Sequence, residues 1–159
     1  MNANASLLKN VYLFKGLGMV ELVDILKICH KTSFPKGKII FMEGELGDRC
    51  YIIESGAVRI SKHIPGVGEE AFKVLRDGDY FGEMSLIDGS ARSAASIAHE
   101  DTKCLVIAKA DLDRLLAGDK ELGNKILTVF CKTLSQRLRE TNDKISQFFA
   151  MTAGYGGHV

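Results

Sequence analysis

Residues 81–96 read FGEMSLIDGSARSAAS, and this stretch contains a single arginine and a single glutamate among small residues. The guanidinium of Arg92 can make a bidentate, charge-assisted contact with a phosphate group. Glu83 would repel a phosphate, and because a carboxylate only accepts hydrogen bonds, its natural partner is a hydroxyl donor such as a ribose 2′-OH. One phosphate and one ribose hydroxyl describe a small nucleotide. The alternative reading is an Arg92–Glu83 salt bridge that caps a turn.

The backbone of the same stretch is open to a ligand. Gly82 lets a ligand approach the main chain closely, and Ser93 and Ala94 are small enough to do the same. The segment GEMSLID is expected to form one short helix after Gly82, and the first N–H groups of a helix attract anions. The stretch holds one arginine and no lysine, which argues against a triphosphate.

Composition excludes several other classes of protein. A net charge of +1 gives no electrostatic reason to expect nucleic acid or a membrane surface as a partner. No apolar run approaches the roughly 20 residues of a membrane span, and the N-terminus lacks the apolar stretch of a signal peptide. The cysteines form no C-x-x-C pair, so we expect buried thiols and a cytoplasmic location; they are Cys29, Cys50, Cys104 and Cys131.

Enzyme and metal-site motifs are not found at their required spacings. The sequence has no P-loop pattern, no complete G-x-G-x-x-G and no G-x-S-x-G around Ser85. The four histidines show neither H-x-H nor H-E-x-x-H spacing. We therefore expect a binding protein that is not an enzyme and that needs neither a metal nor a cofactor.

The patterning divides the chain into three parts and a tail. Residues 6–33 are predicted to be helical, with a break at the KGLG of residues 15–18. Residues 34–108 are rich in short β-type runs, residues 111–151 are again helical, and residues 152–159 are expected to be a flexible tail. A single domain over residues 1–151, of the α+β class, fits a chain of this length.

The strands of the middle part are separated by turn signals too short to hold a helix. An antiparallel sandwich or barrel is therefore favoured over a parallel α/β sheet. The predicted strands are residues 38–42, 50–54, 57–64, 70–75, 95–99 and 102–108.

The last helical region has the repeat of a coiled coil. Asp111 is expected to be an N-cap, and the helix over residues 122–149 carries a seam with alternating steps of four and three residues. We expect two copies of the chain to pair along it as a homodimer. The seam consists of Leu127, Cys131, Leu134, Leu138, Thr141, Ile145 and Phe148.

Residues 81–96 resemble the phosphate-binding cassette of the cyclic nucleotide-binding domain family, and we call them the cassette below. The resemblance extends to LLKNVYLFKGLGMVELVDI (7–25) and PKGKIIFMEGELGDRCYIIESGAVRIS (35–61), and covers about residues 7–149. It implies an antiparallel β-roll, a jelly-roll-like double-stranded β-helix, flanked by N-terminal helices and a long C-terminal helix. It also implies that the ligand closes this last helix over the roll.

The resemblance assigns roles to residues of the cassette and of the strands before it. Gly82 would help to hold the ribose, and backbone or hydroxyl hydrogen bonds to the phosphate would come from Ser85, Ser93 and Ala94. Glu83 would hold the ribose 2′-OH and Arg92 the cyclic phosphate, whereas Ile60 and Leu75 would line the wall against the base. The segment QRLRETNDKIS (136–146) resembles the dimer helix of the bacterial catabolite-activator branch, in which a polar pair faces the base from the two subunits. The full predicted set is Gly82, Glu83, Met84, Ser85, Arg92, Ser93, Ala94, Ile60, Leu75, Thr141 and Asn142.

These observations predict a regulatory sensor for a cyclic mononucleotide. The resemblance makes cAMP the first choice, because Ser93 follows the arginine as a serine does in the bacterial cAMP activators, where a threonine would have suggested cGMP. cGMP stays open because serine also carries the hydroxyl that could reach the guanine amino group. Two alternatives stay open as well: a dimerising interaction module that ignores nucleotides, and the sensor half of a truncated cAMP-dependent transcription regulator. Thr141 is open to a second reading, as a tolerated polar residue of the seam. The downstream effector protein is not visible in the sequence.

Overall fold

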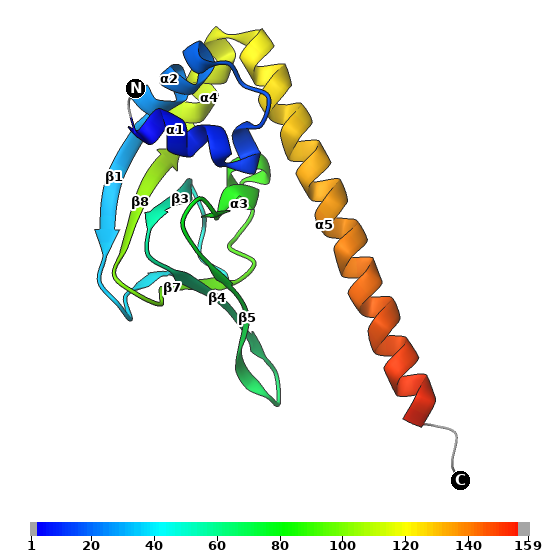
Figure 1. Cartoon of the computed structure of the whole chain (residues 1–159). Helices are drawn as coiled ribbons and strands as arrows, with labels where there is room; N and C mark the ends of the chain where they lie inside the picture. The colour runs from blue at the N-terminus through cyan, green and yellow to red at the C-terminus, as the bar shows by residue number, and fades with distance from the viewer. Residues whose placement is uncertain (1–2, 156–159) are drawn as a thin grey trace.

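The computed structural model describes residues 3–155 (Figure 1). The helices are α1 (Ala3–Asn10), the 3-10 helix η1 (Tyr12–Phe14), α2 (Met19–Lys27), α3 (Glu83–Asp88), α4 (Lys109–Gly118) and α5 (Lys120–Tyr155). The strands are β1 (Cys29–Phe34), β2 (Ile39–Phe41), β3 (Arg49–Ser55), β4 (Val58–Ile64), β5 (Gly68–Leu75), β6 (Tyr80–Phe81), β7 (Ala95–Ala98) and β8 (Thr102–Ala108).

The strands form two antiparallel sheets of four strands each, in the orders β1-β8-β3-β6 and β2-β7-β4-β5. Strand β4 lies between β7 and β5, so that Ile60 stands opposite Ser96 on one side and Lys73 on the other. Cross-strand partners project from the same face of a sheet. These three side chains therefore belong to one surface. The predicted fold class, an antiparallel β-roll with flanking helices, is confirmed.

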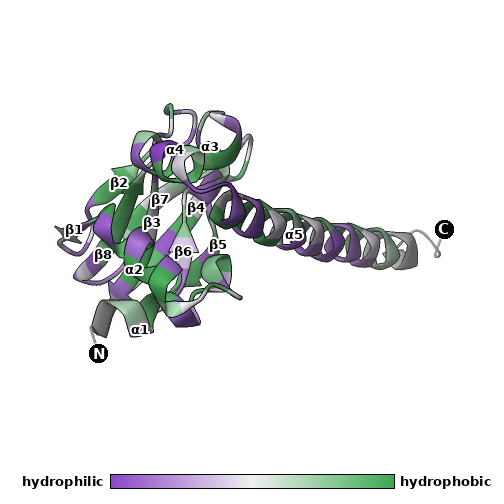
Figure 2. Cartoon of the chain, turned by 90° about the horizontal axis from the view of Figure 1, so that it is seen from above, coloured by the Kyte–Doolittle hydropathy of each residue, from purple (hydrophilic) through white to green (hydrophobic). Residues whose placement is uncertain are grey.

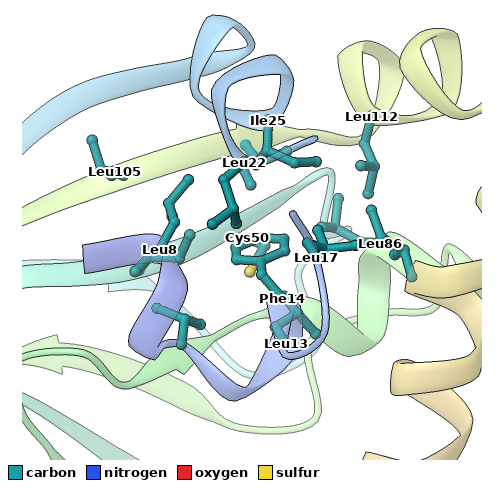
Figure 3. Packing of buried hydrophobic residues seen from close by; sticks show 14 of the residues in the cluster. Leu8, Leu13, Phe14, Leu17, Leu22, Ile25, Cys50, Leu86, Leu105 and Leu112 are labelled. Atoms are coloured by element: carbon teal, nitrogen blue, oxygen red, sulfur yellow. The ribbon is translucent and has the colours of Figure 1, made fainter. Parts of the chain in front are cut away.

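The core has two parts. The N-terminal helices, α4 and the beginning of α5 pack on the β3–β8 sheet around the buried sulfur of Cys50 (Figure 3). A second cluster fills the space between the two sheets, where the rings of Tyr51 and Phe81 stack with centroids 5.0 Å apart. Phe41 completes this aromatic group. Packing in these two clusters holds the strands of the β-roll in place beneath the cassette.

Helix α5 changes surroundings along its length. Its first turns are buried through Leu122, Ile126 and Phe130, and Thr133 is the last buried residue. The side chains from residue 134 to residue 152 are all exposed. In Figures 1 and 2 this part of α5 extends away from the β-roll. Between residues 3 and 155, no helix combines the length and apolar character needed to cross a membrane.

Several predicted boundaries are wrong. Residues 29–34 form strand β1, although residues up to 33 were expected to be helical, because β1 is an exposed edge strand of mostly polar residues with no apolar alternation. Asp111 lies inside α4, whose N-cap is Ala108. Helix α5 continues to Tyr155, so the predicted tail begins too early; its residues 156–159 lie outside the described part of the chain.

The cysteines fit the prediction in part. All four are free, and Cys50 and Cys104 are buried. Burial raises the pKa of the Cys104 thiol to about 12, as it does for the half-buried Cys29. The expectation of a buried thiol is wrong for Cys131, which lies exposed on α5.

Candidate functional site

A cavity of about 410 Å³ lies between the β2-β7-β4-β5 sheet, the cassette and α5. Its volume is in the range of small-molecule sites. Ten of the predicted site residues line it: Ile60, Leu75, Gly82, Glu83, Met84, Ser85, Arg92, Ser93, Ala94 and Thr141. The chain therefore brings residues from β4, β5, the cassette and α5 to one place.

Arg92 is a buried cation that lines the cavity, with 6% of its surface exposed. Its Nη1 donates to the carbonyl oxygen of Gly82 and its Nη2 to that of Arg49, each at 2.8 Å. The guanidinium carbon lies 4.0 Å from the centroid of the Phe41 ring. Burial lowers the pKa of Arg92, because desolvation disfavours the charged form.

No carboxylate is paired with Arg92 among the ion pairs of residues 3–155. The alternative of an Arg92–Glu83 salt bridge is therefore wrong. Two buried polar atoms in this region of the fold, Nε of Arg92 and Oγ of Ser96, have no hydrogen-bond partner, and both residues line the cavity. Because buried polar groups are nearly always satisfied, these atoms indicate a place for a ligand or for ordered water.

The backbone around Arg92 is shaped by two glycines. Gly82 is the N-cap of α3 and has a φ of +76°, and a Cβ there would lie 2.6 Å from Nη1 of Arg92. At Gly47 a Cβ would lie 2.5 Å from Oγ of Ser85 and 2.6 Å from Nε of Arg92. The loop around Glu45 fixes the arginine from the other side, since the amide of Arg92 donates to the Glu45 carbonyl at 2.8 Å. A side chain at either glycine would displace the guanidinium.

Glu83 is paired with the long helix. Its side chain is 5% exposed, and its Oε1 accepts a hydrogen bond from Nη1 of Arg137, whose side chain is 43% exposed. The guanidinium of Arg137 also lies 5.7 Å from the centroid of the Tyr80 ring. This ion pair connects α5 to the first residue of α3. Sequence reasoning missed Arg137, although it precedes Thr141 by four residues and so lies on the same face of a helix.

The remaining walls of the cavity are of two kinds. The sheet side carries the apolar side chains of Ile60 and Leu75 beside the polar Lys73 and Ser96, and the helix side carries polar groups. The cavity residues that the sequence did not indicate are Phe41, Lys73, Tyr80, Phe81, Ser96, Arg137, Glu140 and Lys144. Lys73 lies two residues before Leu75 and so on the same face of β5, but it becomes a candidate only once the pairing of β5 with β4 is known. Ser96 and Phe41 come from strands whose register cannot be read from the sequence.

The two predicted residues of α5 differ in position. Thr141 lines the cavity and its hydroxyl donates to the carbonyl of Arg137 at 2.8 Å. Asn142 is exposed and does not line the cavity of its own chain. Its predicted contact, with a ligand in the partner subunit, stays a prediction.

Comparison with known proteins identifies a family for this arrangement. The sequence model described as "Cyclic nucleotide-binding domain" matches residues 31–119. The chain is 34% identical over 135 residues to the cyclic AMP receptor protein of Thermus thermophilus, covering 85% of this chain and 61% of that protein. It is also 34% identical over 131 residues to cGMP-dependent protein kinase 2 of Mus musculus, covering 81% of this chain and 17% of the kinase.

A solved structure has the same architecture. A cyclic nucleotide-binding domain from Methylobacillus flagellatus superimposes with a TM-score of 0.79 at 30% identity, and the match covers 91% of this chain and 81% of the other. The chain spans less than two thirds of the length of the curated relatives named above.

Proposed function

Since the chain belongs to the cyclic nucleotide-binding domain family, we propose that it binds a cyclic mononucleotide in this cavity and acts as a regulatory sensor, not as a catalyst. cAMP is the first candidate for the ligand, and cGMP is the second. The relatives support both, because one is named a cyclic AMP receptor protein and another a cGMP-dependent protein kinase. The cytoplasmic location expected from the sequence stays a prediction.

The observation that carries this proposal is the buried Arg92 without a carboxylate. A buried cation is costly unless an anion compensates it. Two backbone carbonyls satisfy only part of the five N–H donors of a guanidinium. A cyclic phosphate supplies a single negative charge and two exocyclic oxygens, which match the donors that are left.

The ribose would lie beside Glu83. Arg137 occupies Oε1 of this carboxylate, and a carboxylate has further lone pairs for a 2′-OH donor. Gly82 at the start of α3 leaves the backbone accessible there. The apolar side chains of Ile60 and Leu75 would then cover the face of the base, with Thr141 of α5 at its polar edge.

The exposed seam of α5 supports a homodimer. Leu138, Ile145 and Phe148 are 62%, 49% and 63% exposed and recur at coiled-coil spacing. Burying apolar surface stabilises an assembly by about 25 cal/mol per Å², so this stripe favours pairing with a second copy. Pairing would bring Asn142 of one chain towards the nucleotide of the other. The downstream effector protein is not identified.

Calorimetric titration tests the proposal most directly. We expect the protein to bind cAMP or cGMP, and to bind linear 5′-AMP much more weakly. Removing one charge-assisted hydrogen bond costs about 1.5–3 kcal/mol, so Arg92→Gln should weaken binding by about 10- to 150-fold. The matched control is Arg76→Gln, an exposed arginine outside the cavity.

Three outcomes would contradict the proposal or one of its assigned contacts. If the wild-type protein sediments as a dimer and binds no cyclic nucleotide, the interaction-module alternative is correct. If Arg92→Gln binds as the wild type does, the phosphate does not lie at Arg92. 2′-Deoxy-cAMP should bind the wild type more weakly than cAMP does. If the same ratio of affinities persists in Glu83→Gln, the ribose hydroxyl does not contact Glu83.

A further inference from the structure

Met84 places an oxidisable sulfur atom in the wall of the cavity. It is the second residue of α3 and lines the cavity together with Arg92 and Ser93. Met84 is 42% exposed, so small solutes reach it from the solvent. Its Sδ accepts a hydrogen bond from Oγ of Ser93 at 3.9 Å. Under the proposed function, on which this inference rests, the same hydroxyl is available to bond the phosphate.

The other methionines between residues 3 and 155 are similar in exposure but not in position. Met19, Met42 and Met151 are 45%, 46% and 68% exposed, and none of them lines the cavity. An oxidant in solution therefore reaches several methionines of this chain, but only the product at Met84 changes the composition of the cavity wall.

The oxidation of a methionine by a hydroperoxide transfers one oxygen atom to the sulfur. With hydrogen peroxide, a lone pair of Sδ attacks one peroxide oxygen, an S–O bond forms and the O–O bond breaks. The departing hydroxide takes up the proton of the transferred oxygen, so the products are methionine sulfoxide and water. The sulfur loses two electrons and the peroxide gains them. A thioether is a weak acceptor, whereas the sulfoxide is a polar group.

We propose that Met84 is a site of oxidative modification that regulates ligand binding: its sulfoxide oxygen accepts the hydrogen bond of Ser93 and thereby weakens binding of the cyclic nucleotide. A hydroxyl has one hydrogen to donate, so Ser93 cannot bond the sulfoxide and the phosphate with it at once. Methionine sulfoxide reductases reverse the modification. A nucleotide bound in the cavity covers Met84 and slows its oxidation.

The experiment uses the full chain with Cys131→Ser, so that the exposed thiol of α5 does not react. This parent chain is compared with the same chain carrying Met84→Leu or Met42→Leu. Each protein is titrated calorimetrically with cAMP, or with cGMP where that ligand binds more tightly, before and after treatment with hydrogen peroxide. Mass spectrometry of its peptides measures the sulfoxide at each methionine. Each protein is compared with its own untreated form, so an effect of the substitution on the starting affinity does not enter.

Oxidation should raise the dissociation constant of the parent chain about tenfold, because one hydrogen bond to a charged group is lost. Treatment with reductases for both sulfoxide epimers should restore the starting value. In Met84→Leu the dissociation constant should change less than about twofold on oxidation, since leucine has no sulfur. Met42 is the matched control, because it is similarly exposed but lies outside the cavity. Met42→Leu should therefore lose affinity on oxidation as the parent chain does.

Two further measurements test the contact with Ser93. In Ser93→Ala the hydroxyl is absent, so most of the effect of oxidation should disappear. Saturating nucleotide should slow sulfoxide formation at Met84 and leave its rate at Met42 unchanged. Because Met84 is exposed and lies outside the buried core, the oxidised parent chain is expected to keep the unfolding temperature of the untreated one.

Three results would overturn the proposal: an equal loss of affinity on oxidation in Met84→Leu; an unchanged affinity of the parent chain when its Met84 is fully converted to sulfoxide; or an undiminished loss in Ser93→Ala. These results differ from failure of the proposed function, in which the untreated protein binds no cyclic nucleotide and both proposals fall together.

Discussion

Removing Arg137 should destabilise the ligand-free protein more than neutralising its partner Glu83. The two side chains form the ion pair between α5 and α3, but they differ in exposure, at 5% for Glu83 and 43% for Arg137. In Arg137→Met the carboxylate stays buried without its cation. In Glu83→Gln the arginine is free to turn into solvent.

The exposed fractions of the two side chains set the expected loss of unfolding free energy in each variant. Loss of one partner costs about 3–5 kcal/mol for a fully buried pair and about 0–1 kcal/mol at the surface. With one partner buried and one half-exposed, we expect about 2 kcal/mol for Arg137→Met and below about 1 kcal/mol for Glu83→Gln. For a domain of this size, 2 kcal/mol lowers the unfolding temperature by about 4–8 °C.

Denaturant unfolding of the wild type, both single variants and the double variant measures the coupling. All four should be compared at one protein concentration, because the proposed dimerisation would make apparent stability depend on concentration. The double variant should resemble Glu83→Gln alone, since no charge is then left buried. Arg139→Met is the control, because Arg139 is exposed on the same helix and outside the cavity.

Equal costs for the two single variants that add in the double variant would refute the reasoning. Such a result would mean that α5 is not held to α3 by this pair. An effect of Arg139→Met as large as that of Arg137→Met would point instead to a general influence of charge on the helix.

Three further predictions follow from single contacts. Gly47→Ala places a Cβ 2.6 Å from Nε of Arg92, so cAMP affinity should fall at least about tenfold in titration, whereas Gly118→Ala, with open space around it, should not change it. Thr141→Val should preserve or tighten the dimer in sedimentation and reduce cAMP affinity by one neutral hydrogen bond, about 0.5–1.5 kcal/mol; a weakened dimer with unchanged affinity would make Thr141 a packing residue only. Cys131 is the one exposed thiol of the described chain and lies on the seam. If two copies pair side by side along this seam, mild oxidation should link them through Cys131, and a monomeric product on a non-reducing gel would contradict that pairing.

The cassette could be predicted because its chemistry is local in the sequence. Arg92 and Glu83 are nine residues apart, with glycine and small residues between and beside them. Their closeness in space depends on one short helix and one turn. Local spacing did not reveal the ion-pair partner of Glu83, however, because Arg137 is 54 residues away in the sequence.

The strand register explains the other omissions. Ser96 and Lys73 reach the cavity because both stand opposite Ile60, and the pairing of β4 with β5 shifts at Ile60/Ser61. A register shift of this kind is set by tertiary packing, so periodicity alone does not place these side chains. The edge strand β1 was missed for a related reason, since its polar residues need no apolar face.

The two parts of α5 suggest how occupancy could be transmitted. The first part is fixed to the core through Leu122, Ile126 and Phe130, whereas the second is exposed beyond Thr133. The cavity lies where these parts meet, because Arg137 and the following turn form its helical wall. A ligand shifts a conformational equilibrium only through contacts that differ between the states. We therefore expect a nucleotide that contacts both the cassette and this turn to favour the position of α5 in which Glu83 and Arg137 are paired. The seam continues along the same helix, so a change in the angle of α5 would be carried directly to the surface expected to meet the second copy.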